Sequence, residues 1–188
     1  MIKVNCIDLN KNNFNFELQN HSQLLDLIKS NYILHSDTGP AIKYSNGDRE
    51  YWVNGLLHNT NGPAIDSMIL KEYRVNGIRH REKGPAVIYP DYEEYWQNGY
   101  LHNLNGPAII GNGIYMYYEN GLLHRENGPA YIYLNNFMYY ENGLLHRLNG
   151  PAIEFQDGIK KYFLNGKEYN LFNYYFNLLK GKIYDKTN

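Results

Sequence analysis

The stretch Tyr117-Tyr118-Glu119-Asn120-Gly121-Leu122-Leu123-His124 decides the fold, because close copies of it recur along most of the chain. Asn-Gly between aromatic and apolar residues is a strong hairpin signal, since a type I′ turn needs positive φ at both central residues. From Asn54 to Asn142 the Asn-Gly pair returns every 22 residues, and Gly-Pro-Ala keeps the same spacing from 62–64 to 150–152. A fixed period of this size predicts a repeat architecture.

A two-residue hairpin loop fixes which residues face each other across the two strands. It predicts a Tyr–His pair on one face of each hairpin: Tyr51–His58, Tyr73–His80, Tyr95–His102, Tyr117–His124 and Tyr139–His146. The last hairpin pairs Tyr162 with Tyr169. The other face is predicted to be the packed one and carries large apolar pairs: Trp52–Leu57, Trp96–Leu101, Tyr118–Leu123 and Tyr140–Leu145.

Gly-Pro-Ala is predicted to turn the chain into its next strand, because Gly permits unusual backbone angles and Pro belongs at the start of a strand. A second turn then returns the chain, for example at 111–113, at Asn135-Asn136 and at 156–158. The predicted fold class is therefore all-β: an elongated antiparallel β-meander or open solenoid of about six 22-residue repeats.

The two ends depart from the repeat, as the capping units of an array do. Residues 1–31 are predicted to be an N-terminal cap with a short helix over 22–30 and Ser22 as its N-cap. Residues 32–169 form the array, of which 32–44 preserve only the second half of a repeat. Residues 170–188 form a capping helix and tail, with Asn170 as N-cap and Gly181 as a plausible stop. Its apolar stripe is predicted to cover the last sheet edge: Leu171, Phe172, Tyr175, Leu178 and Leu179.

The hairpin sequence ending in Glu119-Asn120-Gly121-Leu122-Leu123-His124 resembles the MORN-repeat variant family, in which an aromatic residue precedes Asn-Gly and His follows it. The extended form with Gly-Pro-Ala is similar to arrays in uncharacterised proteins of giant viruses, phages and bacteria. The resemblance covers about residues 32–169. It implies an antiparallel β-repeat fold and a role in protein or membrane association. It carries over no catalytic residue.

The composition argues against nucleic acid and membranes as partners. The net charge is −1, so no basic field recruits nucleic acid or an anionic membrane, and no apolar run is long enough to span a bilayer. The N-terminal residues lack the apolar stretch of a signal peptide, and Cys6 is the single cysteine. We therefore expect a cytoplasmic setting. The many Asn, Tyr, Lys and Ile residues have AT-rich codons, as in a large DNA virus, a phage or an AT-rich microbe.

The recurrent histidines allow two interpretations. Histidine is the commonest metal ligand, but no carboxylate or thiol recurs with it, and each His belongs to a separate repeat. The structural interpretation is that each imidazole stacks on its Tyr partner and hydrogen-bonds a neighbouring turn. We favour this interpretation and expect neither a metal site nor a cofactor.

One repeat places two arginines where the others have apolar residues. The register sets Arg74 directly opposite Arg79, which is destabilising unless the charges are compensated. Acidic residues of the next repeat, such as Glu93 and Glu94, would compensate them. Alternatively, Arg74, Arg79, His80 and Arg81 form a site for an anionic ligand or an acidic partner.

The 20 tyrosines also have two interpretations. Aromatic residues favour strands, but Tyr is enriched at binding surfaces as well. Tyrosines that vary between repeats are the better candidates for an interface: Tyr92, Tyr100, Tyr115, Tyr131 and Tyr133.

The sequence contains no P-loop and no other catalytic signature that we recognise. The favoured hypothesis is a non-catalytic protein–protein interaction module, and in a viral setting one that binds or inhibits a host factor. The alternatives are a binder of a small anionic ligand such as a nucleotide, and a structural component that self-assembles through its sheet edges.

Overall fold

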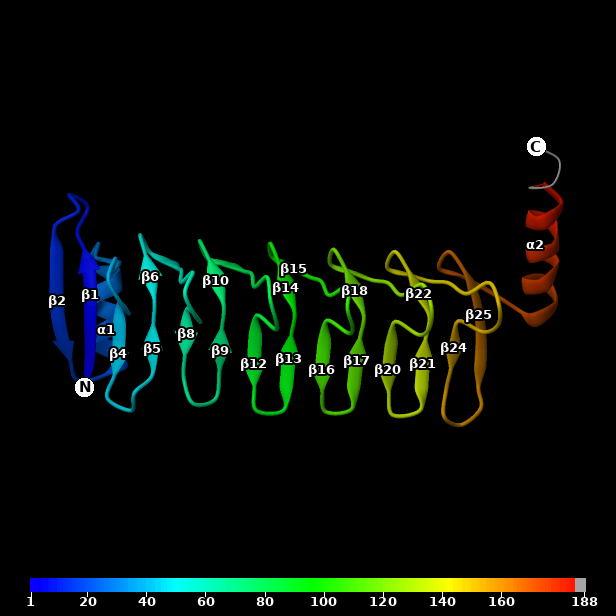
Figure 1. Cartoon of the computed structure of the whole chain (residues 1–188), viewed down its shortest axis with the longest axis horizontal. Helices are drawn as coiled ribbons and strands as arrows, with labels where there is room; N and C mark the ends of the chain where they lie inside the picture. Colours follow the sequence, from blue (N-terminus) through cyan, green and yellow to red (C-terminus); the bar gives the residue numbers. More distant parts are fainter. Residues whose placement is uncertain (185–188) are drawn as a thin grey trace. The chain divides into compact units, whose positions relative to one another are not determined.

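The structure is a computed structural model that describes residues 1–184. The chain forms two compact units, Met1–Tyr100 (unit 1) and Leu101–Asn188 (unit 2). Each unit is an open antiparallel meander, as the repeat predicts, and a helix lies at its terminal end (Figure 1). Within each unit the Asn-Gly hairpins lie along one edge and the second turns along the opposite edge (Figure 1).

The strands of unit 1 form one main sheet with small hairpins above it. The main sheet has the order β2-β1-β4-β5-β8-β9-β12-β13, and β3 also pairs with β1. The bounds of the main-sheet strands are β1 Ile2–Ile7, β2 Asn13–Leu18, β3 Ile33–Leu34, β4 Ile42–Tyr44, β5 Arg49–Glu50, β8 Ile65–Asp66, β9 Lys71–Glu72, β12 Val87–Tyr89 and β13 Tyr92–Glu94. The hairpin strands are β6 Trp52–Val53, β7 Leu56–Leu57, β10 Arg74–Val75, β11 Ile78–Arg79 and β14 Trp96–Gln97.

Unit 2 repeats the same plan. Its main sheet has the order β16-β17-β20-β21-β24-β25-β26. The bounds are β16 Ile109–Gly111, β17 Ile114–Met116, β20 Tyr131–Tyr133, β21 Asn136–Met138, β24 Ile153–Glu154, β25 Lys160–Leu164 and β26 Lys167–Tyr169. The hairpin strands are β18 Tyr118–Glu119, β19 Leu122–Leu123, β22 Tyr140–Glu141 and β23 Leu144–Leu145, while β15 (Tyr100–Leu101) lies at the junction of the units.

The Asn-Gly turns have the predicted type I′ geometry. The six asparagines have φ between 48° and 50°, and the glycines that follow have φ between 77° and 82°. The predicted register is confirmed at Tyr118 opposite Leu123, and also at Tyr162 opposite Tyr169. The turn chemistry therefore fixes the pairing of each hairpin.

One of the second turns was predicted one residue too late. The pairing of Tyr133 with Asn136 places Leu134 and Asn135 in the turn, not Asn135 and Asn136. Leu134 has φ of 51°, a left-handed conformation that a leucine rarely adopts. Because the neighbouring strands hold the register, the leucine takes the position that Asn112 occupies in the preceding copy of this turn.

The incomplete first repeat is completed by β1, which the sequence did not reveal. Val4 pairs with Ile42 as Met116 pairs with Tyr131. The Asn5 N–H donates to the carbonyl of Ala41 at 2.7 Å, as the Tyr117 N–H does to Ala130. The first strand of the chain thus replaces the missing half of the repeat.

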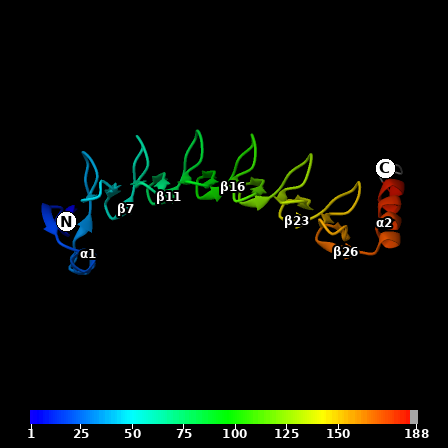
Figure 2. The same cartoon turned by 90° about the horizontal axis from the view of Figure 1, so that it is seen from below.

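The alanine that follows each Gly-Pro is deeply buried in every repeat. The alanines of all six Gly-Pro-Ala elements are at most 1% exposed: Ala41, Ala64, Ala86, Ala108, Ala130 and Ala152. The large pairs that were predicted to be packed, such as Trp52 with Leu57 and Tyr140 with Leu145, are only half-buried. A single-layer sheet explains this, since the loops that follow each histidine cover the alanines on one face, while the large pairs lie on the opposite face (Figure 2).

The N-terminal helix α1 (His21–Lys29) covers one face of the sheet in unit 1, opposite the side from which the loops project (Figure 2). Its N-cap is Asn20, whose side chain accepts from the Gln23 N–H, so the prediction of Ser22 as the N-cap was wrong. Asn20 is the N-cap because the helix begins at His21, one residue before Ser22. Leu24 is buried in one cluster with Ile2, Val4, Leu34 and Ile42.

The C-terminal helix α2 (Leu171–Tyr184) begins at the predicted cap, where the Asn170 side chain accepts from the Asn173 N–H at 2.8 Å. The predicted stop at Gly181 is wrong, because the helix continues to Tyr184. The predicted stripe does not cover the sheet edge either, because four of its five members are exposed: Leu171, Phe172, Tyr175 and Leu179. The helix is held by Tyr174, which is fully buried and stacks near Tyr162.

Candidate interaction surface

The recurrent histidines link neighbouring hairpins. In each case the Nδ1 atom accepts a hydrogen bond from the backbone N–H of the asparagine in the next Asn-Gly turn, at 3.0–3.1 Å. The pairs are His35–Asn54, His58–Asn76, His80–Asn98, His102–Asn120, His124–Asn142 and His146–Asn165. Since the donor is a backbone N–H, Nδ1 is the acceptor in each of these bonds. The His58 Nδ1 also lies 2.8 Å from the Asn76 Oδ1. The predicted bond from each imidazole to a neighbouring turn is confirmed.

The predicted Tyr–His pairing is confirmed for the backbone, but among the described residues the tyrosine rings do not stack on the imidazoles. The N–H of His124 donates to the Tyr117 carbonyl at 3.0 Å, and three other pairs do the same: His58 to Tyr51, His80 to Tyr73, and His146 to Tyr139. Tyr95 and His102 lie in different units, so their pairing remains a prediction. The rings of Tyr73, Tyr117 and Tyr139 are covered by the arginine that follows each histidine rather than by the imidazole.

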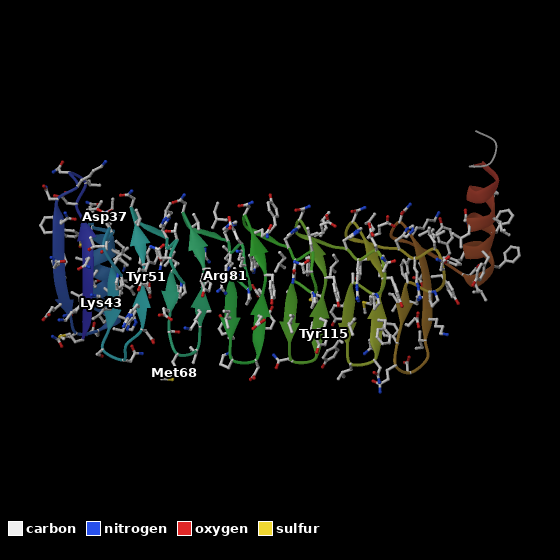
Figure 3. The ribbon with its side chains drawn as sticks, in the orientation of Figure 1. Asp37, Lys43, Tyr51, Met68, Arg81 and Tyr115 are labelled. Carbon is white, nitrogen blue, oxygen red and sulfur yellow. The ribbon has the colours of Figure 1, made fainter. Side chains whose placement is uncertain are left out.

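From His58 to His146, the residue after each recurrent histidine supports the Gly-Pro-Ala loop in one of two ways. Arg125 donates from Nη1 to the Pro129 carbonyl at 3.1 Å, and Arg81 and Arg147 make the same bond four residues ahead. Asn59 and Asn103 reach the equivalent proline carbonyl with their side-chain amides at 2.9 and 2.8 Å. These side chains are therefore loop supports, and Arg81 is one of them (Figure 3).

The opposed arginines of unit 1 are neutralised by a buried carboxylate. The register sets Arg74 opposite Arg79, as predicted. Glu72, only 4% exposed, forms ion pairs with both guanidinium groups, and Arg79 also reaches Glu94 at 3.3 Å. Glu94 was among the predicted partners, while Glu72 was missed because it lies in the preceding strand of the same repeat. Both guanidinium groups are neutralised by these carboxylates, and the Arg74 Nε, which has no hydrogen-bond partner within residues 1–184, is buried, so the geometry does not favour an anion site here.

On the sheet face that carries Arg74 and Arg79, the acidic residues change from repeat to repeat. The residue two positions after each of them changes at the same time. Glu50 accepts from the indole N–H of Trp52 at 2.9 Å, and Glu94 accepts from Trp96. The corresponding positions of unit 2 carry methionine followed two residues later by tyrosine: Met116 with Tyr118 and Met138 with Tyr140. Burial raises the pKa of the Tyr118 and Tyr140 phenols. This face is therefore ionic around Glu72 and Glu94 in unit 1 and apolar at the corresponding positions of unit 2.

The variable tyrosines do not share one surface. Tyr131 and Tyr133 lie on the apolar face of unit 2, opposite Met116 and Ile114. Tyr115 points to the other face and is exposed (Figure 3). Tyr100 is exposed in an Asn-Gly hairpin, whereas the Tyr92 hydroxyl donates to Glu94 at 2.9 Å in unit 1.

The apolar face of unit 2 has a patch that we call the aromatic site, built by Ile114, Met116, Leu123, Tyr131, Tyr133 and Tyr140. Cross-strand pairing and the two-residue alternation of strands place these side chains on one face. Tyr133 is 39% exposed and the others are half-buried. The loops project from the opposite face (Figure 2), and α2, the helix of this unit, packs on β25 and β26.

The opposite face carries open grooves between successive loops. One groove in unit 2 lies between loops 125–128 and 146–149 and is lined by Tyr139, Glu141 and His146. Similar grooves lie between 36–39 and 58–63 and between 59–62 and 80–83 in unit 1. Their tyrosines, histidines and arginines already hold the loops together, so the grooves offer few free donors.

Two further observations concern the described residues. Over residues 1–184 no group of three or more His, Cys, Asp and Glu side chains is placed to hold a metal ion. Neither of the helices in this part of the chain has the length and apolar character to cross a membrane. Comparisons with protein-family models, with curated proteins and with solved structures found no match.

Proposed function

We propose that this chain is a non-catalytic protein–protein interaction module, and that the aromatic site of unit 2 is its binding surface. The observation that carries the proposal is a continuous patch of three tyrosines, a methionine and two aliphatic residues on a face that no helix of its unit covers. Tyrosine and methionine are enriched at protein interfaces, because they combine apolar area with a hydrogen-bonding tip or an adaptable shape.

The scaffold supports this role. Hydrogen bonds join each Asn-Gly turn to the hairpin before it, which holds the strands of the site in place. Such preorganisation lowers the entropy lost on binding. The likeness of the hairpins to the MORN-repeat variant family is part of the same proposal, as are a cytoplasmic setting and, in a viral source, a host protein as the partner.

The test uses a photo-crosslinking phenylalanine derivative at position 133, and the same group at position 115 as the matched control. Both positions hold exposed tyrosines in unit 2, on opposite faces of the sheet. In a lysate of the source or host cell, we expect one dominant protein adduct from position 133 and none of that mass from position 115. The same adducts from both positions, or none from position 133, would overturn the assignment of the surface.

A further inference from the structure

In unit 1, the helix α1 packs on a surface that corresponds to the aromatic site of unit 2. We call this surface of unit 1 the α1 site. The α1 site consists of the residues that pack in one cluster with Leu24, or at the margin of that cluster: Ile2, Val4, Leu18, Leu34, Ile42, Tyr44 and Trp52. Leu27 of the helix lies at the same margin. The apolar side of α1 therefore packs on side chains of the paired strands β1 and β4 and of the strands beside them.

The aromatic site matches the α1 site at most positions. In unit 1, Ile2 pairs with Tyr44 and Val4 with Ile42. In unit 2, Ile114 pairs with Tyr133 and Met116 with Tyr131 in the same antiparallel register.

The flanking positions match as well. Cys6, two residues after Val4, pairs with Leu34, and Tyr118, two residues after Met116, pairs with Leu123. Trp52 corresponds to Tyr140, since each begins the strand of the following hairpin. Six of the seven residues of the α1 site therefore have an apolar or aromatic counterpart in the aromatic site. The exception is Leu18, which pairs with Ile2, because Gly111 takes its place opposite Ile114.

The repeats between these two sites in unit 1 lack this character. There, Arg74 and Arg79 replace the aromatic and leucine positions, and their ion pairs with Glu72 fill the face with charge. The helix-binding surface thus recurs in unit 2 rather than at every repeat, and its Met116 side chain can adapt to different occupants.

We infer that the aromatic site binds an amphipathic helix of a partner protein, in the way that α1 binds its own site. This inference rests on the proposed function and specifies the structural class of the partner. The helix presents leucines three residues apart on one side, as Leu24 and Leu27 are in α1. The tyrosine hydroxyls at the site are available for the polar flanks of that helix.

The test titrates the full chain with a chemically stapled peptide of residues 20–30, and a Leu24→Asp peptide serves as the control. The staple is needed because a helix this short is marginal in water. The intact chain keeps its own α1 in place, since a tethered segment outcompetes a free peptide. The readout is the NMR signal of the methionine methyl groups, because Met116 lies in the site while Met68 is 92% exposed in a turn of unit 1.

We expect a saturable shift of the Met116 methyl signal, no shift of Met68, and no response to the Leu24→Asp peptide. Tyr133→Glu should weaken binding by about tenfold or more, while Tyr115→Glu should leave it unchanged. Equal responses to the two peptides, or no Met116 shift at about 1 mM peptide, would overturn the inference.

Two outcomes separate this inference from the proposed function and from self-association. If crosslinking at position 133 captures a protein but the peptide does not bind, the interaction surface stands and the helical partner is wrong. If the Met116 signal changes with protein concentration alone, the occupant is a second copy, through the exposed stripe of α2, and the inference is again overturned.

Discussion

His124 and Asn142 are joined by a hydrogen bond of 3.1 Å from the Asn142 backbone N–H to the imidazole Nδ1. The N–H of Gly143, the second residue of the same turn, donates to the Leu123 carbonyl at 2.8 Å. Both backbone donors of one turn are thus satisfied by the hairpin before it. This relationship explains why histidine and Asn-Gly recur together without forming a chemical site.

Histidine should be replaceable where its acceptor is preserved. His124→Asn keeps an oxygen near the position of Nδ1, whereas His124→Gln moves the oxygen away. We expect His124→Gln to lower the free energy of unfolding by about 1 kcal/mol, and His124→Asn to lower it less. Urea denaturation measures the free energy of unfolding of both variants. His21→Gln is the control, because His21 makes no hydrogen bond to an Asn-Gly turn in the part of the chain that the structure describes. Equal losses for the two His124 variants would refute an acceptor role.

The buried alanines should not accept larger side chains. Ala130 is fully buried, and its carbonyl accepts from the Tyr117 N–H at 2.7 Å. Ala130→Leu should therefore destabilise the chain by about 1–3 kcal/mol through overpacking, seen as a lower melting temperature. Glu126→Leu, in the exposed loop just before it, is the control and should change stability by at most about 0.5 kcal/mol. A neutral Ala130→Leu would mean that the loops do not enclose the alanine.

The two loop supports should be interchangeable. Arg125→Asn converts one kind of support into the other, as in the repeats with Asn59 and Asn103. We expect it to change stability by less than about 0.5 kcal/mol, while Arg125→Ala loses about 1–2 kcal/mol with the bond to Pro129 and the contact with the Tyr117 ring. Chemical denaturation distinguishes the two. If Arg125→Asn is as harmful as Arg125→Ala, the equivalence is wrong.

The left-handed leucine should be a site of easy stabilisation. Leu134 is exposed and has φ of 51°, which costs an L-residue other than Asn or Gly about 1 kcal/mol. Leu134→Asn should raise the free energy of unfolding by roughly that amount. Leu148→Asn, at an exposed leucine without positive φ, should give no gain. A gain of the same size at both positions would point to reduced surface hydrophobicity instead.

The ionic cluster of unit 1 should be exchangeable only as a whole. Glu72→Met leaves the half-buried Arg74 without a carboxylate and Arg79 with Glu94 alone, and should cost about 3 kcal/mol or more. The triple variant Glu72→Met/Arg74→Tyr/Arg79→Leu copies the residues of unit 2 and should recover most of this loss. Equilibrium unfolding of the single and triple variants gives the comparison. A triple variant as unstable as the single one would contradict the correspondence between the repeats.

The sequence predicts the local geometry of this fold well, because turn chemistry acts over a few residues. The period, the type I′ turns and the cap at Asn170 all follow from such short-range rules. A strand that replaces part of a repeat from a distant position in the sequence leaves no such short-range pattern. Nothing in the N-terminal sequence marks β1 as the missing half of the first repeat, since it lacks an Asn-Gly turn.

The candidate site could be predicted only in part, for the same reason. Variation between repeats identified Tyr131 and Tyr133, but it identified Tyr115 equally, and only the strand register separates the two faces. The arginine pair was visible in the sequence, whereas its neutralisation by Glu72 depends on a fold that brings them together. The pairing of Glu with Trp and of Met with Tyr was a detectable signal, because these residues are two apart in four of the copies.

The most direct measurement compares what co-purifies with the full chain carrying Tyr133→Glu and with the chain carrying Tyr115→Glu, quantified against the unaltered protein. The account predicts that a stoichiometric partner protein is lost with Tyr133→Glu and retained with Tyr115→Glu, while both variants keep the melting temperature of the parent. Retention of that partner by a folded Tyr133→Glu variant would contradict the claim that the aromatic site of unit 2 is the interaction surface.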